Sequence, residues 1–207
     1  MSAKTKTLVG AVAVTAIGVG IGVTLHSPNG GDEPAATSES TASTESLSDV
    51  DTTTLVVRRE AFCDRVDSAD VEAALGSKAT RASSYGDGDS AELTDSVKDV
   101  AQEYGCTWSG ARGAQARAWV FAPPVTRAWA RHMAHTVPKG CRPERDLPYG
   151  NPSVAFSCGA TRSTVSVRGL FGDAWLSCEL TGRRSEPSAT VASRAGSWCL
   201  AVARAAG

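Results

Sequence analysis

The first strong pattern along the chain is an unbroken apolar run near its start. After Lys4 and Lys6, the eighteen residues 8–25 (LVGAVAVTAIGVGIGVTL) carry no charge. An α-helix of that length reaches ~27 Å, close to the thickness of the hydrocarbon layer of a bilayer. The flanking cations precede the run, so the positive-inside rule makes residues 1–7 a cytoplasmic tail. The pattern predicts a single-pass protein of the cell membrane, with everything after residue 25 outside the cytoplasm.

A cleaved signal peptide is the alternative for the same segment. Signal peptides have an apolar core of ~7–15 residues followed by a small-x-small cleavage site. The run here is longer, and Val23, Leu25 and His26 do not form such a site. We therefore favour the anchor, while secretion after cleavage stays open. Both interpretations place the rest of the chain outside the cytoplasm.

Residues 26–57 lose the apolar pattern. Ser, Thr, Gly and Pro dominate this stretch, and all of its charged residues are acidic. Leu47 and Val50 are the only sizeable apolar residues between positions 27 and 54. Such a composition cannot bury enough surface to offset chain entropy. It predicts a disordered, acidic Ser/Thr-rich linker.

Periodic apolar positions return over residues 58–207, a length that suits one domain. Helical spacing predicts helices over 68–75, 125–137 and 188–206, the first capped by Ser68 and ended by Gly76. Alternation predicts strands over 103–109, 117–122, 153–158, 162–168 and 174–180. Residues 77–98 and 138–152 are turn-rich and predict a mobile loop and an ordered loop, respectively. Short connections favour antiparallel pairing, so the fold class is α+β, an antiparallel sheet of about five strands covered by helices.

Six cysteines lie in this domain, and an even number in an oxidising compartment predicts up to three disulfides. The cysteines are Cys63, Cys106, Cys141, Cys158, Cys178 and Cys199. Fifteen full connectivities are open on sequence alone. The positions of the predicted elements favour three disulfides: Cys178–Cys199 between the last strand and the last helix, Cys63–Cys106, and Cys141–Cys158.

The sequence contains few signs of catalytic chemistry. The sequence has no G-x-S-x-G, S-x-x-K, phosphate-loop or H-E-x-x-H motif. His132 and His135 share a helix face but have Arg127 and Arg131 beside them, so we expect no metal site and no cofactor. The carboxylates Glu144, Asp146, Asp173 and Glu179 are available, but spacing singles out no pair. The domain is therefore expected not to be an enzyme.

The tryptophans are expected to lie mainly in the hydrophobic core and not in a binding site. The five tryptophans, Trp108, Trp119, Trp129, Trp175 and Trp198, occupy alternating or helical positions. Most are expected inside, and one or two could line a groove for a sugar or a peptide.

Charge is distributed unevenly along the domain. Residues 55–107 hold 11 acidic and 6 basic side chains, net −5, whereas residues 108–207 hold 5 acidic and 13 basic, net +8. One interpretation is that the two halves face and neutralise each other. The other is an anion-binding surface for lipid headgroups, wall polymers or an acidic protein patch, with Arg127, Arg131, Arg142 and Arg145 as the candidate residues. Nucleic acid is excluded as a partner by the location outside the cytoplasm.

Several segments give the chain a family likeness: FCDRVDSADVEAALG, YGCTW, FAPP and GLFGDAWLSC. Over residues 62–204 the chain resembles uncharacterised actinobacterial extracytoplasmic domains, found in lipoproteins or singly anchored envelope proteins, although it lacks a lipobox cysteine. The resemblance implies no activity and no catalytic residues. We expect a membrane-anchored binding or interaction module of the cell envelope. The alternatives are an envelope hydrolase that acts through carboxylates and a structural subunit of a membrane complex.

Overall fold

The computed structural model describes residues 44–94 and 97–207. The expected cytoplasmic tail, the expected transmembrane helix over 8–25 and most of the expected linker lie outside these residues. Within the described ranges, no helix is long and apolar enough to cross a membrane.

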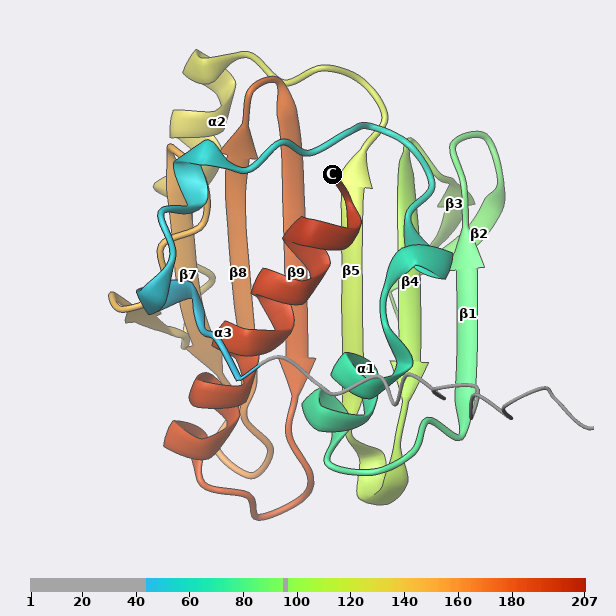
Figure 1. Ribbon diagram of the computed structural model, residues 1–207, viewed down its shortest axis with the longest axis vertical. Coiled ribbons are helices and arrows are strands. Elements are labelled where there is room, and N and C mark those ends of the chain that lie inside the picture. The colour runs from blue at the N-terminus through green and yellow to red at the C-terminus, as the bar shows by residue number, and fades with distance from the viewer. Residues whose placement is uncertain (1–43, 95–96) are drawn as a thin grey trace, which may run out of the picture. The chain divides into compact units, whose positions relative to one another are not determined.

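A seven-stranded antiparallel sheet forms the centre of the domain (Figure 1), which confirms the α+β class. Its strands, in spatial order, are β1 (Arg81–Tyr85), β4 (Glu103–Ser109), β5 (Gln115–Phe121), β9 (Ala174–Thr181), β8 (Thr164–Phe171), β7 (Ser153–Cys158) and β6 (Arg142–Glu144). A separate hairpin pairs β2 (Ser90–Thr94) with β3 (Val97–Val100). The five predicted strands are all present, but the number five was wrong.

The missed strands are the polar ones at the margins of the fold. Residues 77–98, predicted as a mobile loop, contain β1 and β2, and β6 lies in the predicted loop 138–152. Four of the five residues of β1 are exposed, so the strand buries no alternating face that its sequence could reveal. β6 has three residues, one of them Pro143, and pairs with β7 alone, as is typical of an edge.

Two helices cover one face of the sheet, α1 (Ser68–Leu75) and α3 (Ser188–Ala205) (Figure 1). Cys106, Ala118, Cys178 and Val167 stand opposite one another across four strands and lie in the core beneath the helices. At this interface Trp198 of α3 packs edge-on against the Trp108 ring, with 5.3 Å between ring centroids.

α1 ends where the sequence predicts, but the residue that caps its start differs. Gly76 follows α1 with φ of 65°, the left-handed conformation that glycine adopts without strain, as predicted. The N-terminal cap is Asp67 rather than Ser68, because the Asp67 carboxylate accepts the Ala69 N–H at 2.8 Å.

Residues 44–57, expected as part of the linker, pack on the domain instead. Leu47 is fully buried in the main core, and the hydroxyl of buried Thr52 accepts the Gly150 N–H at 3.0 Å. Arg204 of α3 forms an ion pair with Glu45 at 2.7 Å. Val57 is buried in the same core, and Val50 and Leu55 pack against it. Residues 44–57 therefore belong to the domain, and the predicted end of the linker at residue 57 is corrected.

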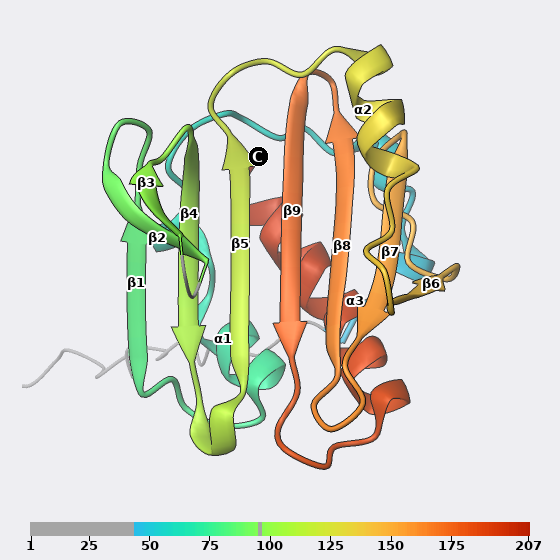
Figure 2. The ribbon, with the colours of Figure 1, turned by 180° about the vertical axis from the view of Figure 1, so that it is seen from behind.

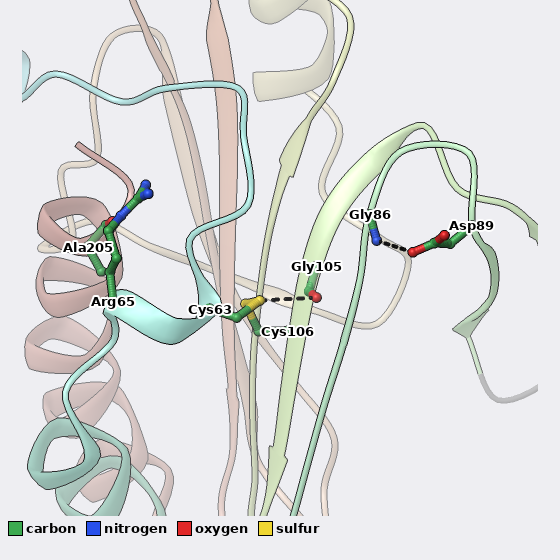
Figure 3. The surroundings of a disulfide bond; sticks show 7 residues. All are labelled: Cys63, Arg65, Gly86, Asp89, Gly105, Cys106 and Ala205. Atoms are coloured by element: carbon green, nitrogen blue, oxygen red, sulfur yellow. Dashed lines mark hydrogen bonds between the residues drawn. A yellow bond between two sulfur atoms is a disulfide. The ribbon is translucent and has the colours of Figure 1, made fainter.

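Three disulfides join the elements, and all three predicted pairings are confirmed: Cys63–Cys106, Cys141–Cys158 and Cys178–Cys199. Figure 3 shows the first of them, which ties the short helix at Cys63–Arg65 to β4. In the same view Arg65 donates its Nε–H to the Ala205 carbonyl at the end of α3, at 2.7 Å. The segment before α1 is therefore fixed to both the sheet and the last helix.

The third helix, α2 (Arg127–Ala134), lies on the opposite face of the sheet (Figure 2). It is shorter than the predicted 125–137, because Thr126 caps it and the Val125 N–H bonds to the Asp173 carbonyl at 2.8 Å instead of starting a helix. Val125 and Ala130 form a second small core with Leu170 and Trp175.

Candidate functional site

The sheet face opposite α1 and α3 is covered only towards its margins. The β2–β3 hairpin lies beside β1 and β4, and α2 lies beside β7 and β8 (Figure 2). A cavity of about 330 Å³ lies between Glu92 of the hairpin and Arg81 and Arg117 of the sheet. We call the part of the face between hairpin and α2 the open face. By strand alternation and register it carries Tyr85, Glu103, Thr107, Arg117, Trp119, Phe156, Ser166, Arg168, Ser177 and Glu179.

Cations and aromatic rings meet at the centre of the open face. The Arg168 guanidinium carbon lies 5.0 Å from the Phe156 ring centroid and 5.9 Å from that of Trp119. The Arg117 guanidinium carbon lies 5.6 Å from the Trp119 centroid, so one indole is shared by two cations. Arg168 also donates its Nε–H to the Ser166 hydroxyl at 3.2 Å. Burial lowers the pKa of Arg168, and the negative charge of Glu179 partly offsets this shift.

Two carboxyl groups on this face have a raised pKa. Burial raises the pKa of Glu179, while the charges of Arg117 and Arg168 act in the opposite direction. Burial also raises the pKa of Glu103. Two contacts act in the opposite direction: the Tyr85 hydroxyl donates a hydrogen bond of 2.5 Å to the Glu103 carboxylate, and Arg117 carries a positive charge nearby. Burial, followed by the contact with Glu103, raises the pKa of Tyr85 well above its ordinary value. Raised carboxyl pKa values in a partly covered face are typical of functional sites.

An apolar groove continues the open face towards α2. This cavity of about 440 Å³ lies between β3, the end of β5 and the start of α2, and its lining includes Val100, Phe121, Pro124 and Trp129. Trp129 is 55% exposed and Val100 57%, values rare for such large apolar side chains. The Trp129 ring stacks on the His132 imidazole with 5.1 Å between centroids. Trp129 thus lines a groove, as expected for one or two of the tryptophans, and Trp119 lies in neither core cluster.

The four arginines singled out from the sequence are all exposed. Arg127 and Arg131 lie on α2, and Arg142 lies on β6 with Arg145 just after it. In the described ranges none of the four forms an ion pair within 4.0 Å. Arg142 lines a cavity beside the β7–β8 turn, which is separate from the open face.

Sequence reasoning missed most of the open face. Glu179 was considered among the carboxylates, but Arg117, Arg168 and Glu103 were not. The strand sequences did contain a signal for these residues. In β5, β8 and β9 a charged residue (Arg117, Arg168 or Glu179) stands between two buried neighbours and so faces away from the main core. Among the described residues, no three His, Cys, Asp or Glu side chains are grouped so that they could hold a metal ion.

Comparison with known proteins adds no relative: no family model, no curated protein and no solved structure matches the chain. What the molecule itself defines is an α+β domain held by three disulfides, which is consistent with an extracytoplasmic location.

Proposed function

We propose that this chain is a membrane-anchored, extracytoplasmic module that binds a partner protein of the cell envelope through its open face. The uncharged run over residues 8–25 supports the anchor, and the disulfides support the oxidising compartment. The resemblance to singly anchored envelope domains points in the same direction.

The observation that carries the proposal is the partial burial of charge at the centre of the open face. Desolvating Arg168 and Glu179 opposes folding, and within the described residues neither forms an ion pair within 4.0 Å that would compensate. A sheet that only had to fold would be more stable with neutral residues at these positions. Arg168, which stacks on Trp119 and Phe156, and the nearby Glu179 are therefore better explained as preorganised binding groups.

The composition of the open face favours a protein over a lipid or a wall polymer. Its two arginines are matched by two glutamates, so it offers no net positive field for a polyanion. Tryptophan, phenylalanine, tyrosine and arginine are the residues that dominate the energetic centres of protein interfaces. The adjoining groove with exposed Trp129 offers an apolar anchor pocket at the margin of the same surface.

The hydrolase alternative gains no support from the geometry. Glu103 and Glu179 are separated by four residues along β4 and by two strand spacings, which is about 16 Å between backbones. Glycosidase carboxyl pairs lie roughly 5–9.5 Å apart. A subunit role in a membrane complex uses the same surface and differs only in whether the partner is permanent.

Site-specific photocross-linking in native membranes tests the proposal. A benzophenone amino acid would replace Trp129 beside the open face, and the same group at exposed Ala73 of α1, on the opposite side of the sheet, is the matched control. We expect a discrete adduct from position 129 alone. Trp119→Ala, which removes the ring shared by Arg117 and Arg168, should abolish that adduct without loss of the folded protein. Equal adducts at both positions, or none at 129, would refute a binding role for this face.

A further inference from the structure

A further cavity, separate from the open face, has the features of an anion site. It has a volume of about 610 Å³ and lies between the β7–β8 turn and the start of α3; we call it the α3 cavity. Arg142, Ser157, Thr161 and Ser188 are among its lining residues. Its walls are mostly backbone and hydroxyl groups rather than apolar side chains.

The N-terminus of α3 borders this cavity through Pro187 and Ser188. α3 has 18 residues, and the residue before it is Pro187, which supplies no capping side chain. The N–H groups of Thr190 and Val191 bond to the Pro187 carbonyl, whereas in the described chain no hydrogen bond satisfies those of Ser188 and Ala189. Two unpaired N–H groups at the positive end of a helix dipole favour an anion.

Independently, Ser157 places an unpartnered hydroxyl at the same cavity. Ser157 is 5% exposed, and its Oγ has no hydrogen-bond partner in the described structure. It shares a strand face with Ala155, which packs in the core on the α3 side, so its side chain points to the side of the sheet where α3 begins. A buried hydroxyl without a partner costs ~1–3 kcal/mol, a cost that a bound ligand would remove.

The charges around the α3 cavity favour an anion as well. Arg142 is exposed on its wall and forms no ion pair in the described ranges. The one carboxylate in the lining, Glu186, is already bound: it accepts the Arg183 N–H at 2.9 Å and an Arg194 guanidinium N–H at 2.7 Å. Arg183 also contacts it through its own guanidinium at 3.4 Å, so two arginines neutralise this single negative charge.

We infer that the α3 cavity binds a phosphate group, with the Ser188 and Ala189 N–H groups, the Ser157 hydroxyl and Arg142 as its donors. The volume exceeds that of one free ion, so the phosphate can belong to a phosphate monoester that extends over the β7–β8 turn. This site is separate from the open face and does not depend on the proposed protein partner.

The test is an amide chemical-shift titration of the full chain in nanodiscs of zwitterionic lipid at constant ionic strength. Inorganic phosphate should shift the Ser188 and Ala189 amides saturably, with a dissociation constant in the millimolar range or tighter. Glycerol phosphate in a second arm should bind at least as tightly if the phosphate belongs to a larger molecule. Weaker binding of glycerol phosphate would assign the site to the free ion.

Variants identify the donors. Arg142→Gln and Ser157→Ala should each weaken phosphate binding about fivefold or more, whereas Arg145→Gln, a matched arginine of the same segment, should leave it within twofold. Unchanged amide shifts away from the cavity would show that each variant is folded. No saturable shift at Ser188 and Ala189, or equal affinity in Arg142→Gln and Arg145→Gln, would overturn the site. Neither result depends on cross-linking at the open face.

Discussion

Glu179 shows at the scale of one residue how the open face differs from an ordinary sheet surface. Along β9 its neighbours Cys178 and Leu180 are fully buried in the main core, while Glu179 points the other way, opposite Arg117. Burial there outweighs the attraction of two arginines, because the pKa of Glu179 is raised. The ionised form is therefore less favourable in the folded protein than in water.

The substitution Glu179→Gln should stabilise the domain at neutral pH. A raised pKa in the folded state gives stability that is present below the unfolded pKa and is lost as the pH rises through the folded value. Glutamine cannot ionise, so the stability difference in favour of the variant should grow from acidic to neutral pH. Urea denaturation at about pH 3.5 and pH 7 measures it. A variant that is less stable than the wild type at pH 7 would mean that attraction to Arg117 and Arg168 dominates.

Gly169 is required on β8 for a different reason, the close approach of another chain segment. A Cβ at this position would overlap the Tyr149 carbonyl oxygen, which is backbone and cannot rotate away. Gly169→Ala should cost about 3 kcal/mol or more of unfolding free energy. At Gly86 an added Cβ meets nothing closer than 3.6 Å, so Gly86→Ala should stay within about 0.5 kcal/mol. Similar costs for both, measured by urea denaturation, would contradict this account.

Among the elements, α3 is the one that holds the molecule together. It packs on β8 and β9, contacts α1, and carries both Cys199 and the Trp198 ring that meets Trp108. Its N-terminus forms the α3 cavity, and its C-terminal end accepts a hydrogen bond from Arg65. The apolar stripe of this helix was readable from the sequence, because its buried residues recur at helical spacing.

Removing the disulfide between α3 and β9 tests how far the helix depends on it. Cys178 and Cys199 are 21 residues apart, and closure of a loop of this size stabilises by about 3.4 kcal/mol in the chain-entropy model. The double variant Cys178→Ala with Cys199→Ala should lose about that much, plus a smaller packing term because both residues are fully buried. Urea denaturation under oxidising conditions is the measurement. A loss below about 1 kcal/mol would show that helix packing alone fixes α3.

For the whole molecule, the central expectation concerns the segment over residues 8–25, which lies outside the described structure. We expect the full chain to stay with membranes after washing with alkaline carbonate, and mass spectrometry to recover peptides from residues 8–25. The disulfide-bonded domain should be accessible in whole cells to a protease that cannot cross the bilayer. Recovery of a chain that starts after residue 25 in the medium would replace the anchor with a signal peptide.

The amino-acid sequence by itself determined much of this protein. It specified the α+β class, the five central strands and three helices, because apolar periodicity acts locally along the chain. The same predicted elements favoured the three disulfide pairings that formed, although the cysteines alone leave fifteen connectivities open. Only the tertiary structure decided that residues 44–57 belong to the domain and that β1, the β2–β3 hairpin and β6 complete it. β1 and β6 are ordered by pairing with strands of the central sheet, β2 and β3 by pairing with each other, and residues 44–57 by the burial of Leu47 and Val57. None of these contacts requires a periodic pattern in the segment's own residues. The open face and the α3 cavity arise in the same way: Arg117 meets Glu179 across 62 positions through strand register, and Ser157 meets Ser188 at a cavity that exists only after the sheet and α3 have packed.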